Sequence, residues 1–172
     1  MTAAGCGVEP GAMNGFPTEV EAVLERYFAA ELTTFSRTGV PITVALTPIW
    51  QAEAGRIMAT TGIGLPQKLY NIRRNPKVAL LYSDPTGSGL TQRAAVLVQG
   101  DATISKITTW DDELAAWYEM AWRKQPNGIG TDVISRRILS WYFQRVKIHV
   151  TPRRVLWWPD GDMSAAPKAV MA

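Results

Sequence analysis

Cysteine and histidine are almost missing from the 172-residue chain, which has one of each, Cys6 and His149. A single cysteine excludes an internal disulfide and any thiolate metal cluster. A single histidine offers only one base for a Ser-His-Asp or Cys-His catalytic set, and it excludes a histidine-rich metal site. The acidic residues show no paired spacing typical of a carboxylate metal cage. The sequence therefore predicts no metal ion and no side chain in the role of catalyst.

Long apolar runs are lacking as well. No run approaches the roughly 20 residues that a helix needs to cross a bilayer, and the N-terminus has neither the basic nor the apolar region of a signal peptide. We therefore expect a cytoplasmic protein without a membrane partner. The 18 basic and 15 acidic residues give a net charge of only +3, and no run is rich in Lys and Arg. Nucleic acid is not an expected partner either.

The two common nucleotide-binding loops are also missing. The loop Gly-x-x-x-x-Gly-Lys-Ser/Thr does not occur, and neither Gly62-Ile-Gly64 nor Gly128-Ile-Gly130 completes a Gly-x-Gly-x-x-Gly motif. A chain without a conventional catalyst fits the class of enzymes whose bound cofactor carries the chemistry. Such a protein needs only to bind and orient the cofactor.

The chain is long enough for one domain with a real core, and hydrophobic residues make up 47% of it. We place this domain at residues 17–159. It lies between a flexible N-terminal segment, 1–16, and a flexible C-terminal tail, 160–172, which is small in composition and contains proline.

Helix and strand patterns follow one another in an irregular order. Apolar residues at helical spacing predict helices over 18–28, 66–75, 111–124 and 132–144. Runs rich in β-branched and aromatic residues predict strands over 32–37, 42–50, 56–61, 78–82, 94–105, 145–151 and 155–158. Because helices interrupt the strands instead of alternating with them regularly, we expect a mainly β (α+β) fold, an antiparallel barrel with flanking helices.

Two details of these elements bear on packing. In the last helix, Ile134, Ile138 and Trp141 fall on one face, which we expect to meet the core or an interface. His149 lies on the polar side of a strictly alternating strand, which favours a place at the surface or in an interface.

The turn between the strand 56–61 and the helix 66–75 carries several polar residues. Thr60 and Thr61 end the strand, and Gln67 and Lys68 begin the helix, whose unpaired N–H groups and dipole favour an anion. Two hydroxyls, an amide and an ammonium group would together form a phosphate cradle. A strand-to-helix turn also carries Thr and Lys simply because both tolerate solvent, and the spacing alone leaves both interpretations open.

Five motifs follow one another in a definite order. They are TPIW at 47–50, GRIMATT at 55–61, Lys68 with NIRRNPKVALL at 71–81, VLVQGDATI at 96–104 and VTPRRVLWWP at 150–159. Together they resemble the flavin-binding split-barrel family of the pyridoxamine 5′-phosphate oxidase type, especially its branch of deazaflavin-dependent reductases. The resemblance covers roughly residues 19–159, and the order and spacing are more specific than any single motif.

This resemblance implies a six-stranded antiparallel split β-barrel that forms a homodimer. It also implies two equivalent sites at the subunit interface, which bind FMN or, as the alternative, the deazaflavin coenzyme F-420. In the family, a lysine before an Asn-Pro pair and hydroxyls at the end of the preceding strand hold the cofactor phosphate. The matching positions are Lys68, Thr60 and Thr61.

Further contacts with the cofactor are implied on other strands. Trp50 would lie alongside the ring system, and Trp157 or Trp158 would approach it from the C-terminal strand. Gln99 would make a polar contact. For each tryptophan, packing in the core or at an interface is the alternative interpretation.

The chain departs from the oxidase pattern in two places. An Arg and a Ser precede the lysine in that pattern, where this chain has Gln67 and Pro66, so one phosphate-binding cation is missing. The substrate-binding Arg-x-His of the oxidase has no clear counterpart near the C-terminus. We therefore expect a reductase or an oxidase that acts on a substrate other than the vitamin.

The expected function is that of a flavin-type oxidoreductase, which transfers hydride to or from a small organic substrate. One alternative is a non-enzymatic flavin or haem binder or sensor, for which His149 is the only possible axial histidine. Another is an interaction domain with an empty site. The loop 84–90 and the Trp-rich helix at 110–122 either shape a substrate entrance or are ordinary surface excursions.

Overall fold

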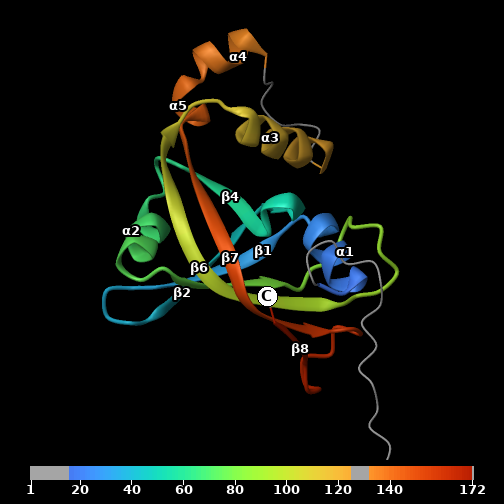
Figure 1. Cartoon of the computed structure of the whole chain (residues 1–172). Coiled ribbons are helices and arrows are strands. Elements are labelled where there is room, and N and C mark those ends of the chain that lie inside the picture. Colours follow the sequence, from blue (N-terminus) through green and yellow to red (C-terminus); the bar gives the residue numbers. More distant parts are fainter. Residues whose placement is uncertain (1–15, 125–131, 172) are drawn as a thin grey trace, which may run out of the picture.

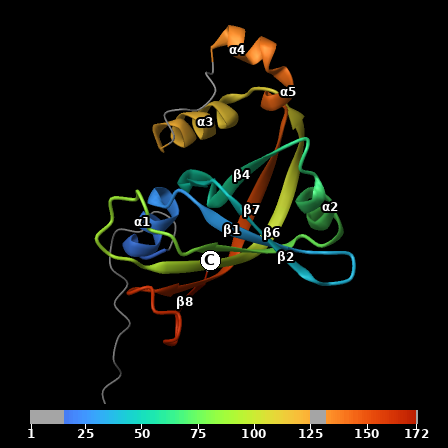
Figure 2. The same cartoon turned by 180° about the vertical axis from the view of Figure 1, so that it is seen from behind.

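Two long antiparallel strands, β6 (Ala95–Thr108) and β7 (Arg145–Trp158), run through the centre of the fold. The structure is a computed structural model, and it describes residues 16–124 and 132–171. Three helices gather at one end of these strands, and two others lie on opposite flanks of the sheet (Figure 1; Figure 2). The first three are α3 (Asp112–Lys124), α4 (Val133–Ile138) and α5 (Ser140–Phe143), and the flanking two are α1 (Thr18–Arg26) and α2 (Gln67–Arg74).

The eight strands form one antiparallel sheet in the order β2-β1-β5-β6-β7-β4-β3, and β8 pairs with β7 beside this path. This mainly antiparallel sheet with a few helices confirms the expected fold class. The remaining strands are β1 (Ala30–Phe35), β2 (Pro41–Leu46), β3 (Pro48–Gln51), β4 (Arg56–Gly62), β5 (Lys77–Tyr82) and β8 (Lys168–Met171).

The expected number of six strands is wrong, and the reason lies at Thr47. This residue alone separates β2 from β3, the strands at the two ends of the sheet order. β2 pairs with β1, whereas β3 pairs with β4. The segment 42–50, which was expected to form one strand, therefore bends at Thr47 and contributes two strands, one at each end of the sheet order. With β8 in the tail, the sheet has eight strands.

β7 continues through Pro152, where the sequence predicted an interruption. Pro152 lies opposite Gly100 of β6, at a register shift between Gln99 and Gly100. Such an irregularity accommodates a residue that has no N–H group to donate. The backbones approach closely, because a Cβ atom on Gly100 would lie 2.2 Å from the carbonyl oxygen of Thr151.

The helix expected over 132–144 is divided at Leu139 into α4 and α5. Asp132 caps α4, and its Oδ1 accepts hydrogen bonds from the backbone N–H groups of Ile134 and Ser135, each at 3.0 Å. The face expected to meet the core or an interface is open in the single chain, with Ile134, Ile138 and Trp141 exposed by 69%, 72% and 65%.

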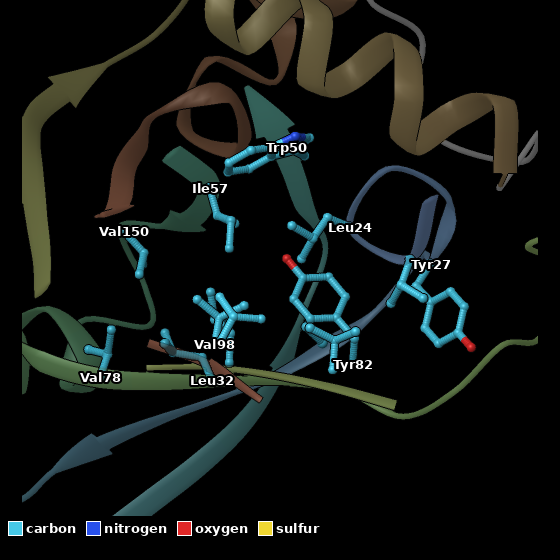
Figure 3. Packing of buried hydrophobic residues seen from close by; sticks show 14 of the residues in the cluster. Leu24, Tyr27, Leu32, Trp50, Ile57, Val78, Tyr82, Val98 and Val150 are labelled. Atoms are coloured by element: carbon cyan, nitrogen blue, oxygen red, sulfur yellow. The ribbon is translucent and has the colours of Figure 1, made fainter. Parts of the chain in front are cut away.

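The main core unites side chains from α1 and from most of the strands. Leu24, Leu32, Ile57, Val98 and Val150 meet in this cluster, and Figure 3 shows that they converge from different elements. A second cluster lies under α3, where Met58, Leu114, Trp117, Tyr118, Ala121 and Phe143 pack together. Because Ile57 and Met58 are adjacent on β4, the two clusters occupy opposite faces of that strand.

The end segments include ordered parts. Phe16, the last residue of the N-terminal segment 1–16, is buried in the main core, while residues 1–15 lie outside the described residues. In the tail 160–172, strand β8 pairs with β7, and the Lys168 ammonium lies 5.0 Å from the centroid of the Trp157 ring. No helix in the described part of the chain is long and apolar enough to cross a membrane.

Candidate functional site

Lys68 lies in the first turn of α2 and reaches back to the end of β4. Its Nζ donates a hydrogen bond to Thr61 Oγ1 at 2.9 Å and lies 3.4 Å from the carbonyl oxygen of Leu65. Burial lowers the pKa of Lys68, and the nearby charge of Arg145 lowers it further. Within the described residues, no carboxylate forms an ion pair with Lys68. A half-buried ammonium group with neutral partners is suited to receive an anion.

A pocket of about 410 Å³ lies beside Lys68. Its walls come from the turn before α2 and from the β1–β2 hairpin. The lining residues are Thr34, Ile42, Val44, Ala45, Gly64, Leu65, Pro66, Gln67 and Lys68. One end is cationic and the walls are largely apolar, which suits a ligand that joins an anionic group to an apolar ring.

The two threonines of the expected cradle have different surroundings. Successive side chains of a strand point to opposite faces, and only Thr61 contacts Lys68. Thr60 is two residues from Met58, on the face of β4 that α3 covers. Its hydroxyl is buried, and it has no hydrogen-bond partner within the described residues. The structure therefore brings Thr61 to Lys68 and leaves Thr60 on the other side of the strand.

Asn71 fixes α2 on the sheet and was not anticipated from the sequence. Its side chain is fully buried, and Nδ2 donates to Thr34 Oγ1 of β1 at 3.0 Å. Its Oδ1 accepts from Gln67 Nε2 at 3.1 Å and from Arg74 Nη2 at 2.6 Å. Gln67 lines the pocket, but its amide nitrogen is engaged with Asn71. The position of Asn71 between Leu69 and Ile72 on the buried face of α2 is the sequence signal for its role.

Arg145 opens β7 directly opposite Gly62, the last residue of β4. A Cβ atom on Gly62 would lie 3.5 Å from Nη1 of this arginine. The guanidinium carbon is 4.9 Å from the centroid of the Trp117 ring, and Tyr142 and Tyr118 lie at 5.4 and 5.7 Å. The sequence interpretation had no role for Arg145, because the strand pattern gave no reason to connect it with Lys68.

The other residues expected to contact a cofactor lie on different parts of the fold. Trp50 and Trp157 belong to the main core cluster and are exposed by 8% and 7%. Trp50 is at the edge of the cluster (Figure 3), with its ring centroid 5.7 Å from that of Phe16. Gln99 lines a separate pocket of about 360 Å³ with Lys77 and Arg153. In one chain, these three residues do not share a pocket with Lys68.

An ionic network attaches α3 to the sheet. Glu113 Oε1 accepts hydrogen bonds from Gln51 Nε2 at 2.9 Å and Arg56 Nη2 at 2.8 Å, and it lies 3.1 Å from His149 Nε2. The other oxygen, Oε2, pairs with Lys147. Although burial alone would raise the pKa of Glu113, the hydrogen bonds from Lys147 and Gln51 and the charge of His149 lower it to about 2. Sequence patterns did not reveal this network, because its members are distant in the chain.

His149 is partly buried within this network, in place of the surface or interface position that its strand pattern favoured. Burial and the charge of Arg56 lower the pKa of His149, against the opposing effect of Glu113. No group of His, Cys, Asp and Glu side chains in the described residues is arranged to hold a metal ion.

The loop 84–90 lies away from Lys68. Its last residue, Leu90, lines a pocket of about 270 Å³ along α1, and no residue of the loop lines the pocket beside Lys68. The Trp-rich segment at 110–122 packs on the other face of β4 from Lys68, where Trp117 contacts Arg145. The two segments that the sequence grouped together therefore lie on different parts of the fold.

Comparisons with known proteins identify relatives of this fold. A family model described as pyridoxamine 5′-phosphate oxidase matches residues 16–145. No curated protein matches the chain in sequence. The match covers β1 to β6 and the Lys68 turn, and it ends at Arg145.

Several solved structures share the fold at low sequence identity. An F-420 reductase is 24% identical, with a TM-score of 0.54 over 78% of this chain and 94% of that chain. A protein of the pyridoxinephosphate oxidase family from Clostridium acetobutylicum is 12% identical, with a TM-score of 0.57 over 89% and 92%. A heme binding protein from Mycobacterium smegmatis is 17% identical, with a TM-score of 0.59 over 96% and 60%. At these identities, the likeness establishes the fold.

Proposed function

The chain belongs to the pyridoxamine 5′-phosphate oxidase family, and from this membership we propose that it is a flavin-type oxidoreductase that uses FMN or the deazaflavin coenzyme F-420. The family includes oxidoreductases, and one structural neighbour is named an F-420 reductase. The proposed reaction is hydride transfer to or from a small organic substrate. The departures at Pro66 and Gln67 favour a substrate other than the vitamin.

The observation that carries this proposal is the contact between Lys68 Nζ and Thr61 Oγ1 at 2.9 Å, beside a pocket of about 410 Å³. The donor set fits a cofactor phosphate, because an ammonium group, a hydroxyl and the first turn of α2 all favour a negative charge. Lys68 has no competing carboxylate within the described residues. The apolar walls at Ile42 and Val44 fit the adjoining part of such a cofactor.

The residues of the site indicate which roles the cofactor and the protein would each have. When bound, the flavin or deazaflavin ring supplies the hydride chemistry. Lys68 and Thr61 would hold the phosphate, and the apolar walls of the pocket would exclude water from the adjoining part of the cofactor. No side chain at this pocket is required to act as an acid or a base.

We also propose a homodimer with the cofactor sites at the subunit interface. The pocket beside Lys68 and the pocket at Gln99 are separate in one chain, and an interface would allow residues of two chains to contact one cofactor. Trp50, Trp157 and Gln99 remain proposed cofactor contacts on this basis. The measurement is sedimentation with and without cofactor, and a monomer that binds FMN with full affinity would contradict an interfacial site.

The primary experiment is a binding titration. The full chain is stripped of any ligand and titrated separately with FMN and F-420, while fluorescence is followed. The proposal is supported if either cofactor binds tightly and its binding weakens in Lys68→Ala. The preferred cofactor then shows whether the chain belongs to the FMN-dependent or to the deazaflavin-dependent branch of the family. Binding of neither would contradict it.

A non-enzymatic haem binder is the second candidate, because one structural neighbour is named a heme binding protein. His149 is the only histidine of the chain, and its Nε2 lies 3.1 Å from Glu113 Oε1. Axial ligation through Nε2 would therefore require this contact to break. Haem uptake that is lost in His149→Ala and retained in Lys68→Ala would favour this candidate over the flavin site.

A further inference from the structure

The face of β4 and β7 that α3 covers carries a row of basic side chains, Arg145, Lys147 and His149. α3 lies above β4 in both views of the fold (Figure 1; Figure 2). Register pairing places Thr60 of β4 beside Lys147 and Gly62 beside Arg145. A Cβ atom on Gly62 would lie 3.5 Å from Arg145 Nη1, so the guanidinium group lies over the end of β4. Thr60 is the preceding residue on this same face.

Carboxylates from the start of α3 balance two of these three basic side chains. Lys147 Nζ pairs with Asp111 Oδ2 at 2.6 Å and with Glu113, and His149 Nε2 lies 3.1 Å from Glu113 Oε1. In the part of the chain that the structure describes, no carboxylate forms an ion pair with Arg145. Because a cation withdrawn from water without a counter-charge is unfavourable, Arg145 is the unbalanced member of the row.

Aromatic rings orient the Arg145 guanidinium. Its Cζ lies 4.9 Å from the centroid of Trp117, 5.4 Å from that of Tyr142 and 5.7 Å from that of Tyr118. Aromatic faces attract a guanidinium group without accepting its directed hydrogen bonds. The Nε atom is buried and has no hydrogen-bond partner within the described residues. The rings therefore hold the cation in place and leave this donor unused.

Two hydroxyl groups beneath α3 are in the same situation. Thr60 and Tyr118 are exposed by only 8% and 1%, and neither hydroxyl has a partner among the residues described. Burial raises the pKa of Tyr118 to about 12, against the opposing charge of Arg145, so the phenol keeps its proton at neutral pH. Buried polar groups are normally hydrogen-bonded. Three donors, one each from β4, β7 and α3, thus lack an acceptor in the layer between α3 and the sheet.

We propose that a small monovalent anion of the size of chloride binds in this layer and accepts hydrogen bonds from Thr60, Tyr118 and Arg145. One negative charge matches the one basic side chain that α3 leaves unbalanced. A water molecule would satisfy the two hydroxyls and leave Arg145 without a counter-charge. The ion joins β4, β7 and α3 at one point, as the carboxylates of α3 do farther along β7. The site is separate from the proposed cofactor pocket, because Lys68 lies on the opposite face of β4.

The first experiment measures thermal unfolding of the full chain in sodium chloride and in sodium gluconate. Both salts are used at the same ionic strength, in a buffer without other small anions, so that screening is equal. Gluconate is too large to enter a site of this size. We expect a saturable rise of the unfolding temperature in chloride. The rise should be about 3–6 °C at ten times the dissociation constant.

Two variants remove a hydroxyl with little change of shape. We expect Thr60→Val and Tyr118→Phe each to weaken chloride binding by about 3- to 10-fold, the range of one lost hydrogen bond. In gluconate, both variants should be at least as stable as the wild type, because each removes a buried hydroxyl that has no partner. Arg145→Met should abolish the rise. Thr103→Val, at an exposed position of β6, is the control and should keep the full rise.

Bromide replaces chloride in the second experiment and locates the ion by its anomalous scattering in crystals. The expected peak lies between Thr60 Oγ1, Tyr118 Oη and Arg145 Nε. Equal unfolding temperatures in chloride and gluconate would overturn the proposal and leave water as the partner of the hydroxyls, even if bromide binds at crystal concentration. An equal rise in the wild type and in all variants would place the ion elsewhere and also overturn it.

Discussion

Lys68 and Thr61 are seven residues apart in the chain, yet their side chains meet at 2.9 Å. The contact forms because β4 ends at Gly62 and α2 begins at Gln67, so a short turn returns the chain to the end of the strand. Thr61 Oγ1 also lies 3.4 Å from the carbonyl oxygen of Leu65 within this turn. The hydroxyl therefore links strand, turn and helix at one point, where the ammonium group is held.

The first prediction concerns this ammonium group. We expect Lys68→Ala to weaken FMN binding by about 10- to 100-fold, because a charge-assisted hydrogen bond to the phosphate is lost. Riboflavin binding and the unfolding temperature should change little, since the ammonium group has only neutral partners in the chain. Fluorescence titration measures both ligands. Lys106→Ala, at an exposed position of β6, is the control, and an equal loss of FMN affinity there would refute a specific role for Lys68.

The second prediction concerns Glu113 and the dependence of the free energy of unfolding on pH. Its pKa is lowered from the ordinary value of 4.5 to about 2, so the unfolded chain binds the proton more readily than the folded chain. The stabilisation is fully present above pH 4.5 and is lost as the pH falls toward 2. We expect it to be worth about 2 kcal/mol after allowance for solvent screening.

The variant Glu113→Gln should remove this contribution. Urea unfolding at pH 7 should show a loss of about 2 kcal/mol, and the curve of stability against pH should become flatter between pH 4.5 and 2. Glu119→Gln, which removes an exposed partner of Arg123 on the same helix, should cost less than about 0.5 kcal/mol. Equal effects of the two variants would show that the network does not hold α3 on the sheet.

The third prediction concerns the close approach of β6 and β7. A Cβ atom on Gly100 would lie 2.2 Å from the carbonyl oxygen of Thr151, so Gly100→Ala must displace the backbone. We expect it to lower the free energy of unfolding by about 3 kcal/mol. Gly64→Ala is the matched control, because a Cβ atom there would meet nothing within 4 Å. Thermal or urea unfolding of both variants tests this prediction. An unchanged free energy of unfolding in Gly100→Ala would be incompatible with the close approach of the two backbones at this position.

Much of the fold could be predicted from local patterns. The apolar periodicity around residues 18–28 indicated α1, and the alternation around 145–151 indicated the first half of β7. Pro152 misled because the sequence rule about hydrogen-bond donors does not show that β7 has an extra residue, Arg153, where it pairs with β6. The bend at Thr47 has no local signal either, since it depends on which strands pair on each side.

The candidate site was predictable only in part. Thr61 and Lys68 lie close in sequence, so the strand-turn-helix pattern was sufficient to place them together. Arg145 is far from both in the chain and comes near the end of β4 only through the pairing of β4 with β7. Alternation should also have separated Thr60 from Thr61, because adjacent strand residues face opposite sides. Contacts created by strand pairing require the three-dimensional structure.

The last prediction concerns Asn71, which holds α2 in place without contacting Lys68 or Thr61 through a hydrogen bond in the described structure. Its amide donates to Thr34 Oγ1 at 3.0 Å and accepts from two residues of its own helix. Asn71→Ala would leave the buried Thr34 hydroxyl with only its 3.5 Å contact to the carbonyl oxygen of Ile42. We expect a loss of about 1–3 kcal/mol in the free energy of unfolding.

Asn71→Ala should also weaken FMN binding, but for a different reason from Lys68→Ala. A helix that is less firmly attached to β1 no longer fixes the position of the ammonium group, so affinity and stability should fall together in Asn71→Ala. In Lys68→Ala, affinity should fall alone, because the anchor of the helix is intact. Unfolding by urea and FMN titration on the same samples distinguish the two roles. A stable Asn71→Ala with reduced FMN affinity would place Asn71 in direct contact with the ligand, whereas an unstable variant with full affinity would confine it to the fold.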